Sequence, residues 1–185
     1  MKKWITELWK LGLITLTGVM GSVTAGLMRY GGDVLVPNDI AFAYVAFGLS
    51  GSFIFAFYHV RGLSNTITAA VCASAVQFVA SVSYIPALNS GIWSFGVNLS
   101  VVSLAFLFER KLASFKQLKF VVVGLVYGTL FVLLTLLVAV LTNVASMPAV
   151  VFRENFIDGL LIGLGLGLGV EVGESFVHSL EHHKG

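Results

Sequence analysis

Three carboxylates lie within the last long apolar stretch of this 185-residue chain, which covers residues 156–177. They are Asp158, Glu171 and Glu174, and the other apolar stretches contain no Asp, Glu, Lys or Arg. A charged group is costly to bury in a membrane, so such a residue is a candidate for binding an ion or proton. Asp158 and Glu171 are therefore predicted candidates for an ion pathway.

A structural role is the alternative for each carboxylate. Asp158 lies about one helical turn from Arg153 and could pair with it or cap the start of a helix. Glu171 and Glu174 are three residues apart and could extend toward water or pair with a base such as Arg61.

Two amides form a second candidate site. Gln77 lies near the middle of the third apolar stretch and Asn98 within the fourth. A polar side chain inside a bilayer needs a hydrogen-bond partner in the bundle, so we expect these amides to face each other across a short turn. They could form only an interhelical hydrogen bond, or line a substrate pocket whose mouth includes Tyr84, Asn89 and Trp93.

Histidine and cysteine give little indication of a metal site. The four histidines all lie near one predicted membrane face: His59, His178, His182 and His183. A haem or metal between His59 and His178 is the less favoured prediction. The single cysteine, Cys72, excludes an intrachain disulfide and is predicted to be a small buried apolar residue. We therefore predict no metal and no cofactor.

One short motif could suggest a protease. The segment 48–51, Gly-Leu-Ser-Gly, is similar to the G-x-S-G motif of rhomboid intramembrane proteases. That family has its serine on the fourth helix and a general-base histidine on the sixth, whereas Ser50 lies on the second stretch. A serine needs a base within hydrogen-bond reach to become a nucleophile. The chain is accordingly predicted to have no catalytic residues and not to be an enzyme.

The overall composition is that of an integral membrane protein. Hydrophobic residues make up 57% of the chain and charged residues 11%, against about 25% charged in soluble domains. This composition excludes a soluble enzyme and a disordered chain. The net charge of only +2 also excludes a nucleic-acid-binding protein. We predict a single all-α domain over 1–185, a bundle of six transmembrane helices. The expected spans are 11–28, 40–58, 66–87, 91–108, 120–141 and 156–177.

Basic residues predict the orientation of these spans. Nine of the eleven Lys and Arg residues fall on one side, and only Arg29 and Arg153 fall on the other. By the positive-inside rule, both termini are predicted to be cytoplasmic. Residues 1–10 are expected to form a short interfacial segment, with no evident cleavable signal peptide. The predicted location is a multi-pass position in a bacterial-type inner membrane.

Glycines of the last span predict two close-packing faces. At about 100° per residue, the glycines fall into two stripes with i, i+4 spacing, and the intervening leucines should face lipid. Small residues let helix backbones approach closely. The two stripes are Gly159, Gly163 and Gly167, and Gly165, Gly169 and Gly173. A further small stripe on the first span consists of Gly18, Ser22 and Gly26. The alternating glycines of 163–169 resemble those of ATP-synthase rotor-ring subunits, whose ion-carrying carboxylate is on their other helix.

Two functions fit these features. The first is a small-solute or ion transport or binding subunit that works with partners. Its size, six spans and cytoplasmic ends look similar to the substrate-binding subunits of energy-coupling-factor vitamin transporters, which contact their partner through small residues of the first helix. The alternative is a non-catalytic accessory or assembly subunit of a larger membrane complex. Expected partners are the lipid bilayer and either other membrane proteins or further copies of the chain, bound through the glycine faces.

Overall fold

A computed structural model describes the chain over residues 3–31, 38–62, 65–73, 121–122, 124–126, 129, 133 and 149–182. These residues form helices and no strands, which confirms the predicted all-helical class for the described part. Most of the third, fourth and fifth predicted spans falls outside the described residues, and so does the test of a six-helix count.

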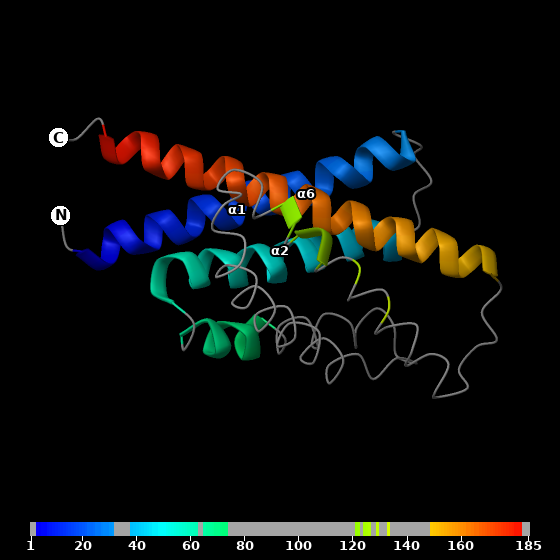
Figure 1. Cartoon of the computed structure of the whole chain (residues 1–185), viewed down its shortest axis with the longest axis horizontal. Coiled ribbons are helices and arrows are strands. Elements are labelled where there is room, and N and C mark those ends of the chain that lie inside the picture. The colour runs from blue at the N-terminus through cyan, green and yellow to red at the C-terminus, as the bar shows by residue number, and fades with distance from the viewer. Residues whose placement is uncertain are drawn as a thin grey trace.

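Three long helices form the described bundle. They are α1 (Lys3–Tyr30), α2 (Asn38–Arg61) and α6 (Ala149–His182). Figure 1 shows that α2 and α6 run antiparallel to α1, and that the N- and C-terminal ends lie at the same end of the bundle. The most extensive contact joins α1 to α6, followed by α1 to α2. Because α1 begins at Lys3, residues 3–10 are helical and continuous with the apolar stretch that follows.

Glycines end the first two helices. Gly31 follows α1 with φ 63°, and Gly62 follows α2 with φ 82°. Their amides donate to the carbonyl oxygens of Leu27 and Tyr58, at 2.9 and 3.0 Å. A glycine enters this left-handed conformation without the penalty that a Cβ imposes, which is why it commonly closes a helix.

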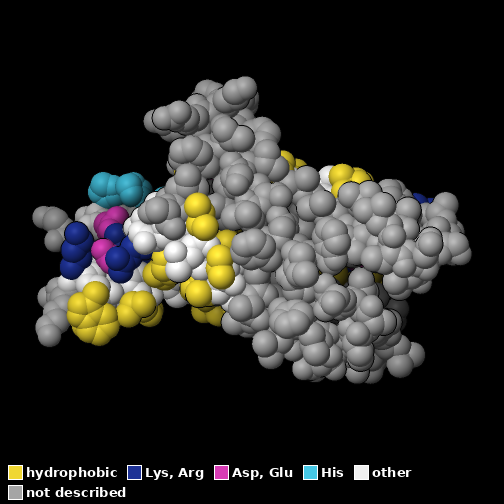
Figure 2. All heavy atoms as spheres, turned by 90° about the horizontal axis from the view of Figure 1, so that it is seen from below, with side chains coloured by type: hydrophobic (Ala, Val, Ile, Leu, Met, Phe, Trp, Pro, Cys, Tyr) yellow, Lys and Arg dark blue, Asp and Glu magenta, His cyan; other side chains and the backbone are white. Residues whose placement is uncertain are grey.

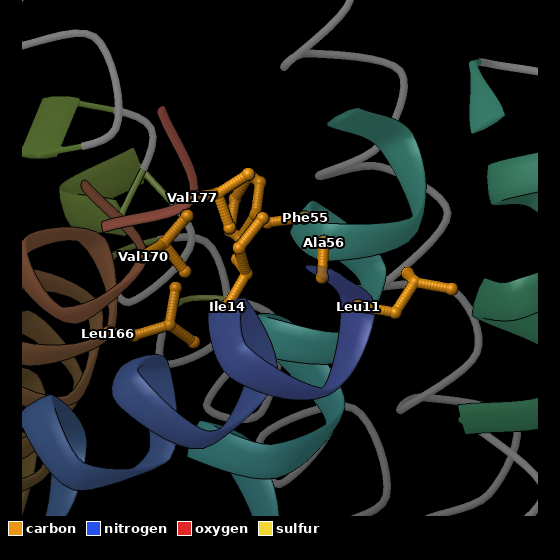
Figure 3. Close-up of a cluster of buried hydrophobic side chains, with 7 residues drawn as sticks. All are labelled: Leu11, Ile14, Phe55, Ala56, Leu166, Val170 and Val177. Carbon is orange, nitrogen blue, oxygen red and sulfur yellow. The ribbon is translucent and has the colours of Figure 1, made fainter. Parts of the chain in front are cut away.

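The three helices share one apolar core. Its buried side chains come from all three helices and are drawn in Figure 3: Leu11, Ile14, Phe55, Ala56, Leu166, Val170 and Val177. Ile14, Ala56, Leu166 and Val170 have no exposed surface. The core lies toward the end of the bundle where the termini meet, so it fixes the C-terminal half of α6 against α1 and α2.

Glycine allows α1 and α6 to approach each other at backbone distance. A Cβ built on Gly165 would overlap the carbonyl oxygen of Gly21, and one built on Gly169 would lie 2.8 Å from the Gly18 Cα. One built on Gly173 would overlap the Thr17 hydroxyl. No side chain fits at these positions without separating the helices. The glycine stripe of α6 formed by Gly165, Gly169 and Gly173 thus packs directly against α1.

The remaining small stripes contact other helices of the same chain. On α1, Gly18 and Ser22 face Ser52 and Gly48 of α2, and Gly26 faces the Tyr44 ring. On α6, the backbone at Gly163 and Gly167 faces Gly124, while Gly159 is buried. The small residues Gly18, Ser22 and Gly26 of α1 and the pair Gly163 and Gly167 of α6 therefore contact other parts of the same chain.

Two of the described helices are long and apolar enough to cross a membrane, by length and composition. They cover Lys3–Tyr30 and Phe156–His182. A helix of about 20 residues spans the hydrocarbon core of a bilayer.

Candidate functional site

Asp158 lies at the centre of a polar cluster between α1, α2 and α6, which we term the Asp158 cluster: Arg29, Tyr30, Tyr44, Glu154 and Asp158. Arg29 Nε lies 2.7 Å from Asp158 Oδ1. The Tyr44 hydroxyl donates to the same oxygen at 2.8 Å, and the Tyr30 hydroxyl reaches both carboxylate oxygens, at 2.9 and 3.0 Å. One carboxylate therefore joins all three helices.

The cluster is largely shielded and is balanced in charge. The side chains of Arg29 and Asp158 are each only 16% exposed, and Tyr44 is buried. The guanidinium also binds Glu154, with Nη2 2.6 Å from Oε2. Glu154 in turn accepts from Nε and Nη2 of Arg153, at 3.1 and 2.8 Å. The two arginines thus offset the two carboxylates.

The predicted partner of Asp158 is corrected by this arrangement. Arg153 binds Glu154, and Asp158 binds Arg29 instead. Because α6 begins at Ala149, Asp158 lies well inside the helix and does not cap it. Residues five apart lie about 140° apart around a helix, so Arg153 and Asp158 point to different sides.

The tyrosines of the cluster also contact each other. The Tyr30 and Tyr44 rings meet edge to face, with centroids 6.4 Å apart, and the Arg29 guanidinium lies 5.4 Å from the Tyr30 ring centroid. Glu154 lies at the exposed margin, where hydrogen bonds from Arg153 and then from Arg29 hold its pKa below the ordinary value.

A second set of ion pairs lies at the opposite end of the bundle. Lys10 of α1 pairs with Glu181 of α6. Arg61 of α2 pairs with Glu7 of α1, with 2.7 Å between Nη2 and Oε2. Figure 2 shows histidine, basic and acidic side chains gathered at one end of the visible face. Arg61 was predicted as a partner for the α6 carboxylates, but it reaches α1 because α1 extends back to Lys3.

Glu174 and Glu171 differ in their surroundings. Glu174 Oε1 lies 3.0 Å from His59 Nε2, so this carboxylate joins α6 to α2. Its neighbour Glu171 is partly exposed, and within the described residues it forms no ion pair. The less favoured prediction of a metal between His59 and His178 is not supported, because His59 turns to Glu174 while His178 contacts His182.

An open apolar groove of about 990 Å³ runs along the surface between α1 and α6. Its floor includes the touching glycines Gly21 and Gly165. Its walls include Met20 from α1 and three leucines of α6, Leu161, Leu164 and Leu168, of which Leu168 is 47% exposed. The two threonines of the groove, Thr17 and Thr24, bond to carbonyl oxygens of their own helix. The groove therefore offers an apolar surface with few free polar groups.

Several predicted residues are placed elsewhere or are not described. Gln77 and Asn98 lie outside the described residues, and the same is true of the proposed pocket mouth. Cys72 is exposed, so the prediction of a buried cysteine is wrong. It lies on the helical segment 65–73, whose Ala70 and Ala73 instead contact α2. Ser50 is buried, and its hydroxyl lies 3.3 Å from the carbonyl oxygen of Phe47.

Sequence reasoning missed three important residues. Arg29 and Tyr44 were not predicted as site residues. The sequence offered one signal for Arg29, which is one of only two basic residues on the predicted outer side, and none for Tyr44. Gly21 was not predicted either, although it contacts Gly165 of α6. A run of small residues at 17, 21 and 25 marks the face of α1 that meets α6.

The chain matches no protein-family model, no curated protein and no solved structure. Within the part of the chain that is described, no group of three or more His, Cys, Asp or Glu side chains could hold a metal ion.

Proposed function

We propose that this chain is a multi-pass inner-membrane protein that acts as a non-catalytic subunit, binding a membrane-spanning helix of another protein in the α1–α6 groove. The single observation that carries this proposal is the groove itself, which is apolar, open and about 990 Å³ in volume. It extends from Trp9 to Arg29, and 20 residues of helix measure about 30 Å, the thickness of a bilayer core.

The polar groups nearby support a contact role. The carboxylate of Asp158 is occupied by one guanidinium and two hydroxyls, and Glu174 is paired with His59. A site that moves an ion needs a carboxylate that can exchange its partner. These two carboxylates instead hold helices together, which suits a rigid subunit with a fixed outer surface.

The shape of the groove favours a helix as its occupant. Exposed apolar ridges flank the groove, with Met20 on the α1 side and Leu168 on the α6 side, and they would interlock with the side chains of a helix laid between them. The ridges are well exposed, since Met20 is 60% and Leu168 is 47% exposed. Large apolar side chains at this level of exposure are unfavourable in water and compatible with lipid or a partner helix.

Site-directed cross-linking tests this proposal. In a Cys72→Ser background, Leu168→Cys places a thiol in the groove, while Val45→Cys places one on α2 at a similar exposure of 44%. In native membranes, the Leu168 variant should cross-link to a specific second protein and the Val45 variant should not. The proposal is overturned if the Leu168 variant labels no protein, labels only further copies of the chain, or if the Val45 variant gives the same product.

A transport subunit is the second candidate, and Glu171 is the observation that favours it. This carboxylate lies within the long apolar helix and, among the described residues, forms no ion pair. An unpaired carboxylate in a membrane can exchange a proton or cation. In proteoliposomes, Glu171→Gln should abolish a proton or cation flux that Glu181→Gln, at the exposed end of α6, leaves intact. Absence of flux in the parent protein would exclude this role for the isolated chain.

A further inference from the structure

Two histidines face each other on the last turns of α6. His178 and His182 are one helical turn apart and exposed, and their Nε2 atoms lie 3.1 Å from each other. The rings meet edge to face, with 4.4 Å between their centroids. Two bare ring nitrogens repel at this distance, and so do two protonated ones. The contact therefore needs one shared hydrogen or one cation between the lone pairs.

The spacing of the two nitrogens matches that of ligands on one metal ion. Zinc binds histidine nitrogen at about 2.0–2.1 Å, so two such ligands at angles between 90° and tetrahedral lie about 2.9–3.4 Å apart. The observed 3.1 Å falls within this interval. Neutral imidazole favours zinc, nickel and copper, whereas magnesium and calcium favour oxygen ligands.

The backbone that carries the pair is held in place by the rest of the bundle. Val177 is buried in the shared core, directly before His178. Glu181, directly before His182, pairs with Lys10 of α1. The two imidazoles thus project from a segment that is fixed through the residues directly before them, so binding an ion would order only two side chains.

We propose that His178 and His182 bind one borderline transition-metal ion, such as Zn²⁺ or Ni²⁺, through both Nε2 atoms. The chain supplies two ligands, and water completes the coordination. This site is independent of the α1–α6 groove and of the function proposed for it.

Metal titration of the full-length chain tests the site. The protein is purified in detergent with an affinity tag that contains no histidine, and Zn²⁺ binding is measured by isothermal titration calorimetry. We expect one ion per chain, and His178→Ala and His182→Ala should each weaken binding by about tenfold or more. Helical content by circular dichroism should be unchanged, because both side chains are exposed.

His183→Ala is the matched control, since it removes a neighbouring imidazole outside the proposed pair. It should leave the affinity within about twofold of the parent. The proposal is overturned if the parent binds no Zn²⁺, or if His183→Ala weakens binding while His178→Ala does not. It is also overturned if all three variants bind as the parent does.

Discussion

Arg29 of α1 and Asp158 of α6 form an ion pair across the helix interface, with Nε 2.7 Å from Oδ1 and each side chain 16% exposed. It lies at the opposite end of the bundle from the shared core and from the Lys10–Glu181 pair. The antiparallel helices are therefore fixed at both ends by charge and in between by backbone contact at the glycines. Such a pair sets the register of two helices as well as contributing to their stability.

Removing the charge of Asp158 should strongly destabilise the bundle. Asp158→Asn keeps an oxygen that can accept from the two tyrosines but leaves the shielded Arg29 with only Glu154 as a charge partner. Breaking one side of a buried pair costs about 3–5 kcal/mol, and the partial exposure here reduces that to about 2–3 kcal/mol. The apparent melting temperature in detergent should fall by roughly 4–12 °C.

A double variant separates the charge effect from loss of packing. Arg29→Met together with Asp158→Asn removes both charges, so neither remains buried without its partner. Removing both charges avoids the penalty of leaving one of them buried without its partner. The double variant should therefore melt above Asp158→Asn alone, and additive losses from the two single variants would show that the pair is not energetically coupled.

The two tyrosines should contribute unequally. Tyr44 is buried and its hydroxyl donates to Asp158 at 2.8 Å, while Tyr30 is only partly buried. Hydrogen bonds to a charged group contribute about 1.5–3 kcal/mol, less where water can replace the partner. Thermal unfolding should therefore show a larger loss for Tyr44→Phe than for Tyr30→Phe. Equal losses would show that the difference in burial between the two tyrosines does not change what their hydroxyls contribute.

The fold was predictable where its cause is local. Long apolar runs and the requirement that a backbone in lipid satisfy its own hydrogen bonds predict helices, and the described residues are helical. The i, i+4 spacing of glycine also predicted close-packing faces on α6. Which helix meets which face depends on distant segments. The small residues at 17, 21 and 25 mark a face of α1, but nothing in the sequence assigns that face to α6, or Gly124 to the face of Gly163.

The polar site was predictable only in part. Asp158 was identified because an acid within an apolar stretch is costly, yet its partner was predicted from sequence proximity as Arg153. The structure pairs it with Arg29, 129 positions away, because α6 starts early and turns Arg153 to another side. Tyr44 carried no signal at all, since aromatic residues are common in such stretches and its role arises from tertiary contact.

Acidification should loosen the margin of the Asp158 cluster. Hydrogen bonds from Arg153 and Arg29 lower the pKa of Glu154 in the folded state. The resulting stability is present above the unfolded pKa of about 4.3 and is lost as pH falls through the lower folded pKa. Melting temperature should therefore drop below about pH 4.3 in the parent and drop less in Glu154→Gln. An equal acid response in both would assign it to other carboxylates.

Adding one methyl group at the helix crossing should separate α1 from α6. Gly165→Ala places a Cβ against the carbonyl oxygen of Gly21, a backbone atom that cannot rotate away as the end of a flexible side chain would. Overpacking of this kind costs about 1–3 kcal/mol, or roughly 2–12 °C of apparent melting temperature. Gly12→Ala is the matched control, because nothing lies within 4 Å of a Cβ built there on α1. Alanine favours helix by about 0.5–1 kcal/mol over glycine, so the control should melt slightly above the parent. If both variants were stabilised alike, the close contact of Gly165 with Gly21 would be disproved.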